Sequence, residues 1–74
     1  MSAKSADRWS VHTYNRESGA AQERRTRRLL KDAETVAQTY IRCTDVGACA
    51  VYDNRKRRVK LTYGCFPVEL LPGY

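Results

Sequence analysis

The sequence has few of the residues on which catalytic and metal sites depend. Its 74 residues include one histidine, three cysteines and no glycine-rich run, and its eight acidic residues are scattered. A cysteine or serine nucleophile needs a base within hydrogen-bond reach, and a zinc site needs closely spaced Cys or His ligands. The spacing of Cys43, Cys49 and Cys65 fits neither a zinc site nor a disulfide framework. We therefore expect free, mostly buried thiols, no catalytic site, no metal and no cofactor.

Long apolar runs are missing as well. No apolar stretch follows Met1, and no segment is long enough for a signal peptide or a membrane span. We expect a cytoplasmic protein with no membrane partner. A chain of this length has room for one domain. We expect a flexible N-terminus at 1–7, a single α+β domain at 8–64, and an apolar C-terminal tail at 65–74 that packs across the core edge or contacts a second copy or a partner.

Three segments alternate apolar and polar residues with the period of two that is typical of β-strands, namely 8–14, 48–53 and 58–63. In the first, Trp9 faces the core, whereas His12 and Tyr14 face solvent. In the last, the side chains expected to face the core are Val59, Leu61 and Tyr63. A polar loop joins the last two strands as a hairpin.

The segment 20–30 is the hardest to assign. A helical apolar stripe covers 29–41, but a helix starting at Ala20 would begin with two turns that bury nothing. Asp32 is a suitable N-cap. We favour a β-hairpin followed by a helix from about Ala33 to Arg42, with one long helix as the alternative. The expected fold is α+β, a small antiparallel sheet in the order β-β-α-β-β packed on one helix.

Positive charge is abundant and unevenly distributed. The net charge is +6, and arginine outnumbers lysine. Most of the basic residues fall in two segments, Arg24, Arg25, Arg27 and Arg28, then Arg55, Lys56, Arg57, Arg58 and Lys60. We expect some of them to join His12 and Tyr14 in a partner-binding sheet face away from the helix. Arginine suits bidentate recognition of carboxylate or phosphate. The alternative is a solvated face that protects an edge strand from aggregation.

Two classes of function fit such a face. The first is a non-catalytic inhibitor or adaptor that docks on an acidic protein surface or a nucleoprotein complex and blocks nucleic-acid access. The second is a direct DNA- or RNA-binding module, with arginines on phosphates and Tyr14 or Tyr52 available for stacking. A homodimer remains open in either case.

The segments 8–14, 32–40, 50–53 and 58–61 resemble, in their order, the small strand-rich, one-helix proteins that phages and mobile elements encode. The layout is most similar to some small anti-CRISPR inhibitors of type I surveillance complexes. The resemblance implies a stoichiometric inhibitor in the bacterial host cytoplasm that binds a CRISPR effector subunit and blocks DNA access, with 24–28 and 55–60 as contacts. The layout also resembles the DNA-binding arms of phage integrases, although these usually place their strands before the helix.

Overall fold

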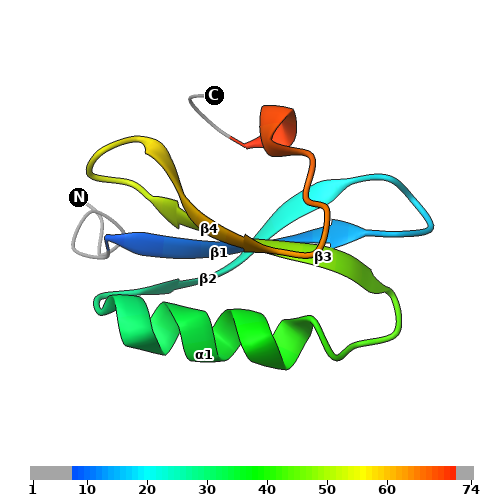
Figure 1. Cartoon of the computed structure of the whole chain (residues 1–74), viewed down its shortest axis with the longest axis horizontal. Coiled ribbons are helices and arrows are strands. Elements are labelled where there is room, and N and C mark those ends of the chain that lie inside the picture. The colour runs from blue at the N-terminus through cyan, green and yellow to red at the C-terminus, as the bar shows by residue number, and fades with distance from the viewer. Residues whose placement is uncertain (1–7, 72–74) are drawn as a thin grey trace.

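The computed structural model describes residues 8–71, except for the side chain of residue 68, so the expected flexible segment 1–7 lies outside the described residues. The elements are β1 (Trp9–Asn15), β2 (Ala21–Arg27), α1 (Leu30–Tyr40), β3 (Val46–Asp53), β4 (Arg58–Tyr63) and a 3₁₀ helix, η2 (Val68–Leu70) (Figure 1). The α+β class is confirmed. The segment 20–30 contains a strand, so the single long helix is wrong.

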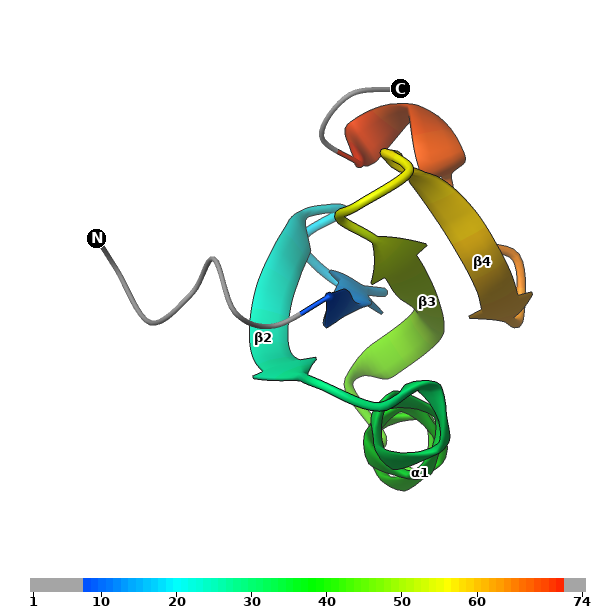
Figure 2. The ribbon, with the colours of Figure 1, turned by 90° about the vertical axis from the view of Figure 1, so that its left-hand side faces the viewer.

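The four strands form one antiparallel sheet in the spatial order β2-β1-β3-β4. β1 and β3 are therefore central, and β2 and β4 are the edges. Helix α1 covers one face of the sheet, and the C-terminal segment with η2 lies on the other (Figures 1 and 2). The fold thus has a helix-side core and a second, smaller core on the outer face.

The helix-side core combines aliphatic strand residues with small helix residues. Val11, Val51, Ala33 and Ala37 are completely buried. The two alanines are four residues apart and lie on one face of the helix, so the helix can approach the sheet closely. Trp9, Val46 and Cys49 complete the buried cluster. The period-two strands and the helical stripe predict most of this core, except for Val46, which the sequence places in the connection after the helix.

The helix begins and ends earlier than the sequence predicts. It starts at Leu30 instead of Ala33, and its N-cap position is Leu29, in an extended conformation with no side-chain cap hydrogen bond among the described residues. Asp32 lies in the first turn, so its assignment as N-cap is wrong. Leu30 packs against the core. Burial of this leucine, not side-chain capping, accounts for the earlier start.

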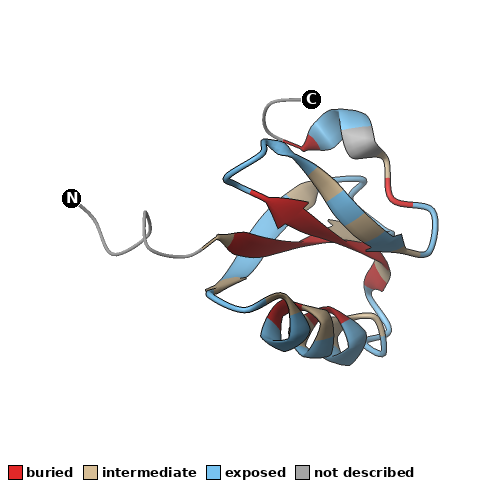
Figure 3. Ribbon diagram, turned by 60° about the vertical axis from the view of Figure 1, so that its left-hand side comes forward, coloured by how far each residue is buried: buried red, intermediate tan, exposed pale blue. Residues whose placement is uncertain are grey.

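The outer face of the sheet is covered, which corrects the expectation that it is an open basic face. Its buried cluster comprises Ala48, Ala50, Tyr52, Phe66 and Leu71, with Tyr14, Ala21 and Val59 packed around it. Figure 3 shows the buried central strands between the helix and the C-terminal segment. The tail therefore packs on the core through Phe66 and Leu71. His12 is only 4% exposed and Tyr14 is half-buried, so their placement in solvent is wrong.

Both edge strands contain a β-bulge whose extra residue is basic. In β2 the partner of Val11 is Arg25 and that of His12 is Glu23, so Arg24 is the extra residue. In β4 the partner of Tyr52 is Val59 and that of Val51 is Leu61, so Lys60 is the extra residue. A bulge changes the face on which the following side chains lie.

The bulge in β4 corrects one core residue. Leu61 and Tyr63 pack on the helix side, but Val59 packs in the outer core beside Tyr52. The sequence predicts Val59 on the helix side because strict alternation takes no account of the inserted residue. The bulges and their charges also disfavour edge-to-edge pairing of the sheet with another chain.

Leu71 and Leu70 provide a matched test of the outer core. Leu71 is buried against the sheet, whereas Leu70 is one of the exposed large hydrophobic residues. We expect Leu71→Ala to lower the free energy of unfolding by about 2 kcal/mol, the low end for a buried leucine. Leu70→Ala should change it by less than about 0.5 kcal/mol. Urea denaturation followed by tryptophan fluorescence measures both, and equal effects would contradict burial of the tail.

Candidate anion-binding end

The strand registers bring the two basic segments to the same end of the sheet. Trp9, at the start of β1, lies opposite Arg27 of β2 and opposite Asp53 of β3. Asp53 in turn lies opposite Arg58 of β4. The β2–α1 connection and the β3–β4 turn therefore flank the start of β1. Figure 2 looks at this end of the molecule, with the two connections on different sides of β1.

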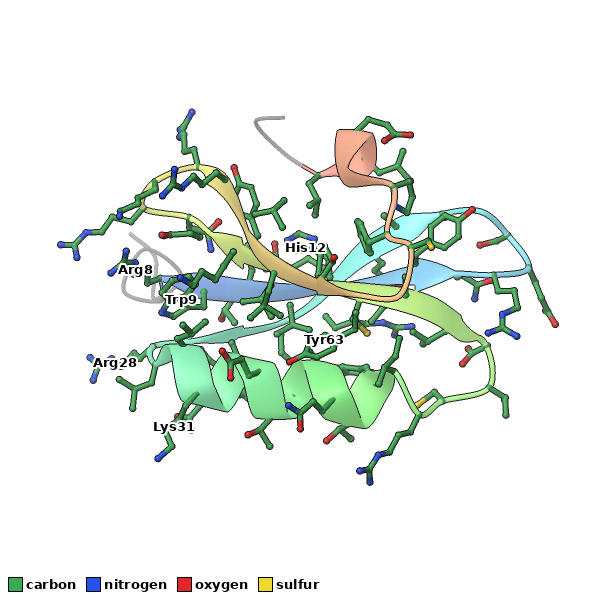
Figure 4. All side chains as sticks on the ribbon, viewed as in Figure 1. Arg8, Trp9, His12, Arg28, Lys31 and Tyr63 are labelled. Carbon is green, nitrogen blue, oxygen red and sulfur yellow. The ribbon has the colours of Figure 1, made fainter. Side chains whose placement is uncertain are left out.

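The basic end, as we call this surface, consists of two groups of side chains around a central arginine. The β2–α1 group is Arg27, Arg28 and Lys31, and the β3–β4 group is Arg55, Lys56, Arg57 and Arg58. All are exposed except Arg27, which is half-buried and donates a hydrogen bond to the Thr26 carbonyl oxygen. Figure 4 shows Arg28, Lys31 and the central Arg8 at this end. So many cations in one place create a positive potential that attracts anions.

The centre of the basic end is electrically neutralised by an ion pair. Arg8 donates from Nε to Asp53 Oδ1 at 3.1 Å and from Nη2 to Asp53 Oδ2 at 3.0 Å. The Arg8 guanidinium also lies 4.7 Å from the centroid of the Trp9 ring. This bidentate pair holds Arg8 in place, so the unbalanced positive charge lies to either side of it.

Asp53 also shapes the β3–β4 turn. Its Oδ1 accepts hydrogen bonds from the backbone N–H groups of Arg55 at 3.0 Å and Lys56 at 3.3 Å. Chiefly because of the Arg8 hydrogen bonds, the pKa of Asp53 is lowered from 3.8 to about 2. A carboxylate that stays charged under ordinary conditions thus positions the backbone that carries the β3–β4 group.

Asn54 ties the same turn to β1. Its backbone N–H donates to the Arg8 carbonyl oxygen at 2.8 Å, and its Nδ2 donates to that oxygen at 3.1 Å and to Ser10 Oγ at 3.0 Å. The turn is therefore anchored to the sheet through several hydrogen bonds. Arginines on an anchored turn lose less conformational freedom on binding than arginines on a free loop.

Arg57 has a backbone conformation that does not suit arginine. Its φ is 57°, the left-handed region that glycine and asparagine adopt more readily. A long charged side chain here costs folding free energy, and such residues tend to occur at functional positions. The strain points to a role for the Arg57 side chain outside the fold.

Replacing Arg57 with glycine tests whether its side chain contributes to folding stability. We expect Arg57→Gly to leave the free energy of unfolding unchanged or raise it by up to about 1 kcal/mol, because the strain is relieved. Arg55→Gly is the matched control, since it removes the same side chain from the same turn without a positive φ to relieve. It should lower stability by about 0.5 kcal/mol. Thermal denaturation measures the stability of both variants. If Arg57→Gly is destabilised more than Arg55→Gly, the backbone of Arg57 is not strained.

The beginning of the helix adds to the positive potential. α1 starts directly after Arg28 and Leu29, and its first turn has no side-chain cap among the described residues. The uncapped N–H groups carry the positive end of the helix dipole. Leu29 is 58% exposed, so one apolar side chain lies among the arginines.

Not all of the predicted site residues lie at the basic end. Arg24 donates from Nε to Thr13 Oγ1 at 3.0 Å and lies 5.6 Å from the Tyr40 ring centroid, on the helix side of the sheet. Arg25 lies farther along β2, opposite Val11. Lys60 is exposed in the bulge of β4.

His12 and Tyr14 belong to the outer core instead of a binding surface. The His12 ring lies 6.0 Å from the Tyr52 ring, and the Tyr14 ring lies 6.3 Å from the Phe66 ring. Both pairs are edge-on contacts that stabilise packing. Tyr52 is itself buried, so neither tyrosine offers an open ring face for stacking on bases. The expected stacking of bases on Tyr14 or Tyr52 has no open sheet face to use, because the outer face is covered.

Sequence patterns miss two features of the basic end. The first is the pair between Arg8 and Asp53, which are 45 residues apart in the chain. No spacing rule in a single sequence connects them. The second is Lys31, which joins the β2–α1 group because α1 starts at Leu30. The sequence predicts a helix start after Lys31 because Asp32 is a suitable N-cap. Lys31 is therefore not grouped, on sequence alone, with the arginines that precede the helix.

The histidine and the cysteines do not form a reactive pair. Burial lowers the pKa of His12, although nearby Glu23 opposes the shift, and the ring shares a hydrogen bond of 3.2 Å with Ser10 Oγ. Burial raises the pKa of Cys49 to about 11, so this thiol stays protonated. All three cysteines are free, but Cys43 and Cys65 are exposed, which corrects the expectation of mostly buried thiols.

Two further features are absent between residues 8 and 71. In that part of the chain no group of three or more His, Cys, Asp or Glu residues is arranged to hold a metal ion. The same residues include no helix with the length and apolar character needed to cross a membrane.

Comparison with known proteins does not place the chain in a family. No family model matches it, and no curated protein or solved structure is significantly similar to it.

Proposed function

We propose that this chain is a non-catalytic nucleic-acid-binding protein that contacts the phosphate backbone through its basic end. The observation that carries the proposal is the convergence of two arginine-rich segments, far apart in sequence, on one end of the sheet. Backbone contacts by Arg and Lys supply most of the affinity of nonspecific binding. The strained Arg57 supports the proposal, because its backbone conformation holds charge at the surface at a cost to folding. The anchored turn supports it as well, because its arginines lose less conformational freedom on binding.

The covered aromatic residues narrow the mode of binding. Proteins that bind single strands without sequence preference stack bases on exposed aromatic rings. Trp9 and Tyr52 are buried, and Tyr14 packs against Phe66. Contacts to phosphates, not stacking, therefore dominate the proposed interaction, and we expect little sequence preference.

A direct binding assay tests the proposed function. We expect a labelled DNA duplex to show increased fluorescence anisotropy on addition of the full chain at low salt, and Arg28→Ala with Lys31→Ala to weaken binding about tenfold or more. The control is Arg16→Ala with Arg42→Ala, which removes the same charge from exposed positions after β1 and after α1, at the opposite end. Absence of binding to DNA and RNA probes at low salt would refute the function, and equal losses in the two variants would refute the role of the basic end.

Exposed Leu29 favours a second candidate function. Interfaces between proteins combine arginines with apolar anchors, and Leu29 lies directly between Arg28 and the helix. In this candidate the chain is an inhibitor, like the anti-CRISPR proteins that its layout resembles, and it docks on an acidic surface of a nucleic-acid-handling complex such as a CRISPR effector.

A nuclease-treated pull-down distinguishes the two candidates. If the second is correct, the tagged chain retains a defined protein complex after DNA and RNA are digested, and Leu29→Ser weakens retention. If the first is correct, captured proteins are lost with the nucleic acid. Leu70→Ser is the control, because Leu70 is exposed on η2, away from the arginines.

A further inference from the structure

The positive charge of the basic end is divided into two groups with a neutral centre. The β2–α1 group follows edge strand β2, and the β3–β4 group precedes edge strand β4. The start of β1 and the end of β3 lie between the two groups, and there Asp53 neutralises the charge of Arg8. A partner with a single line of negative charge would meet one group and the neutral pair, and would leave the other group unused.

The separation of the two groups follows from the sheet order. β2 and β4 are three strand spacings apart, and neighbouring strands lie about 4.8 Å apart, so the two edges are about 14 Å apart. The major groove of B-DNA is about 12 Å wide and is bordered by a row of phosphates on each strand. Arginine and lysine side chains extend several ångströms from the backbone, so both groups can reach phosphates on either side of one groove.

The geometry of the groups favours stable spacing. Asp53 and Asn54 anchor the β3–β4 turn to β1 through side-chain hydrogen bonds, and the β2–α1 connection is held between a sheet strand and a helix that packs on the core. Neither group depends on a free loop. A fixed spacing suits a partner whose charge rows also have a fixed spacing.

From these observations we infer that the basic end binds duplex nucleic acid across a groove, with one group on the phosphates of each strand. The inference rests on the proposed nucleic-acid-binding function and makes it more specific. A flexible single strand presents one charge row with no fixed partner row. An acidic protein surface has no regular pair of rows. Duplex binding therefore uses both groups, whereas binding to a single strand uses one.

Duplexes with one uncharged strand test the inference. We compare a duplex about two helical turns long with the same duplex carrying methylphosphonate linkages, which have no charge, throughout one strand. The full chain should lose about 100-fold in affinity when one strand is neutral, because one whole group loses its contacts. A protein that contacts a single strand would lose about twofold, because half of its sites remain.

Variants that lack one group complete the test. Arg28→Ala with Lys31→Ala removes most of the first group, and Arg55→Ala with Arg58→Ala weakens the second; all four side chains are exposed. Each variant should bind the fully charged duplex about 100-fold more weakly than the full chain, and should lose less than about fivefold more on the duplex with one neutral strand. The two losses are thus not additive, because both remove the same set of contacts.

The outcomes separate this inference from the function on which it rests. Additive losses, a twofold loss for the full chain, or single-strand affinity equal to duplex affinity would overturn the groove-spanning geometry and leave nucleic-acid binding intact. No binding to any of these probes at low salt would overturn both. If polyglutamate displaces the duplex at equal charge concentration, binding does not need two regularly spaced rows of phosphates and the inference fails. Circular dichroism checks that each variant is folded. If Arg55→Ala with Arg58→Ala does not fold, Arg55→Ala with Lys56→Ala takes its place.

Discussion

Reversing one charge in each group of the basic end should abolish most of the nucleic-acid binding. Arg28→Glu with Arg58→Glu replaces an exposed cation in each group with an anion. We expect the affinity for a DNA duplex to fall at least about 100-fold, because each charge-assisted phosphate contact contributes about tenfold and the new carboxylates repel the backbone. Anisotropy titration at one fixed salt concentration measures the change.

The control for this effect changes net charge by the same amount elsewhere. Arg16→Glu with Arg42→Glu alters exposed residues after β1 and after α1, at the end of the molecule opposite the two groups. The chain has a net charge of +6, so general attraction to DNA declines in both variants. We expect less than about a fivefold loss in the control. Equal losses would show that overall charge, and not the basic end, determines binding.

Asp53→Asn should have the largest effect on stability among the substitutions considered. Asp53 is 4% exposed, pairs with Arg8 and accepts hydrogen bonds from two turn amides. An amide has one acceptor oxygen instead of two, so it cannot accept both hydrogen bonds from the Arg8 guanidinium. Arg8 is 33% exposed and remains solvated, so the expected cost comes from the lost hydrogen bonds to a charged group. We expect a loss of about 2–3 kcal/mol, which is a large part of the stability of a small domain. Thermal denaturation should show a fall in Tm on the order of 10 °C.

The pH dependence of stability gives an independent test of the same ion pair. The pKa of Asp53 is about 2 in the folded protein, against an ordinary value of 3.8. The unfolded chain therefore takes up this proton first as the pH falls. The contribution of Asp53 is complete above about pH 5, and is lost between about pH 4 and pH 2.

A matched variant separates this contribution from general acid unfolding. Asp45→Asn makes the same chemical change at an exposed position in the α1–β3 connection. It should retain the full loss of stability between pH 5 and pH 2, whereas Asp53→Asn should show a shallower loss. If both variants show the same profile as the unsubstituted chain, the Arg8–Asp53 pair does not stabilise the fold.

Three of the four strands could be predicted from sequence because a local alternation specifies them, whereas β2 lies in a segment without that pattern. The segment from Arg58 to Tyr63 alternates strictly and forms β4 with the predicted bounds. The sequence predicted the position of the helix but not the residues at which it begins and ends. Its start depends on tertiary burial of Leu30, which outweighs the favourable cap at Asp32.

The exposed surface was harder to predict than the core. His12 and Tyr14 occupy alternate positions on β1 that would face solvent in a sheet with one open side. The C-terminal segment places Phe66 and Leu71 over that side and buries them. Nothing in the alternation of β1 indicates that a distant tail covers it.

Only part of the candidate site could be predicted from the sequence. The clusters containing Arg28 and Arg58 are visible as charge runs, but their meeting at one end depends on the register of β1 with its two neighbours. The two bulges at Arg24 and Lys60 also have no signal in the sequence. Long-range pairing therefore determines which predicted cations act together.

The salt dependence of duplex binding tests the central claim most directly. Each phosphate neutralised by the protein releases condensed counterions, so log Kobs declines with log salt concentration by about 0.9 for each contact. With both groups of the basic end engaged, we predict a slope of about −4 or steeper for the unsubstituted chain, and a slope shallower by about two for Arg28→Ala with Arg58→Ala. A slope near zero, or one that these substitutions leave unchanged, would contradict phosphate binding by the basic end.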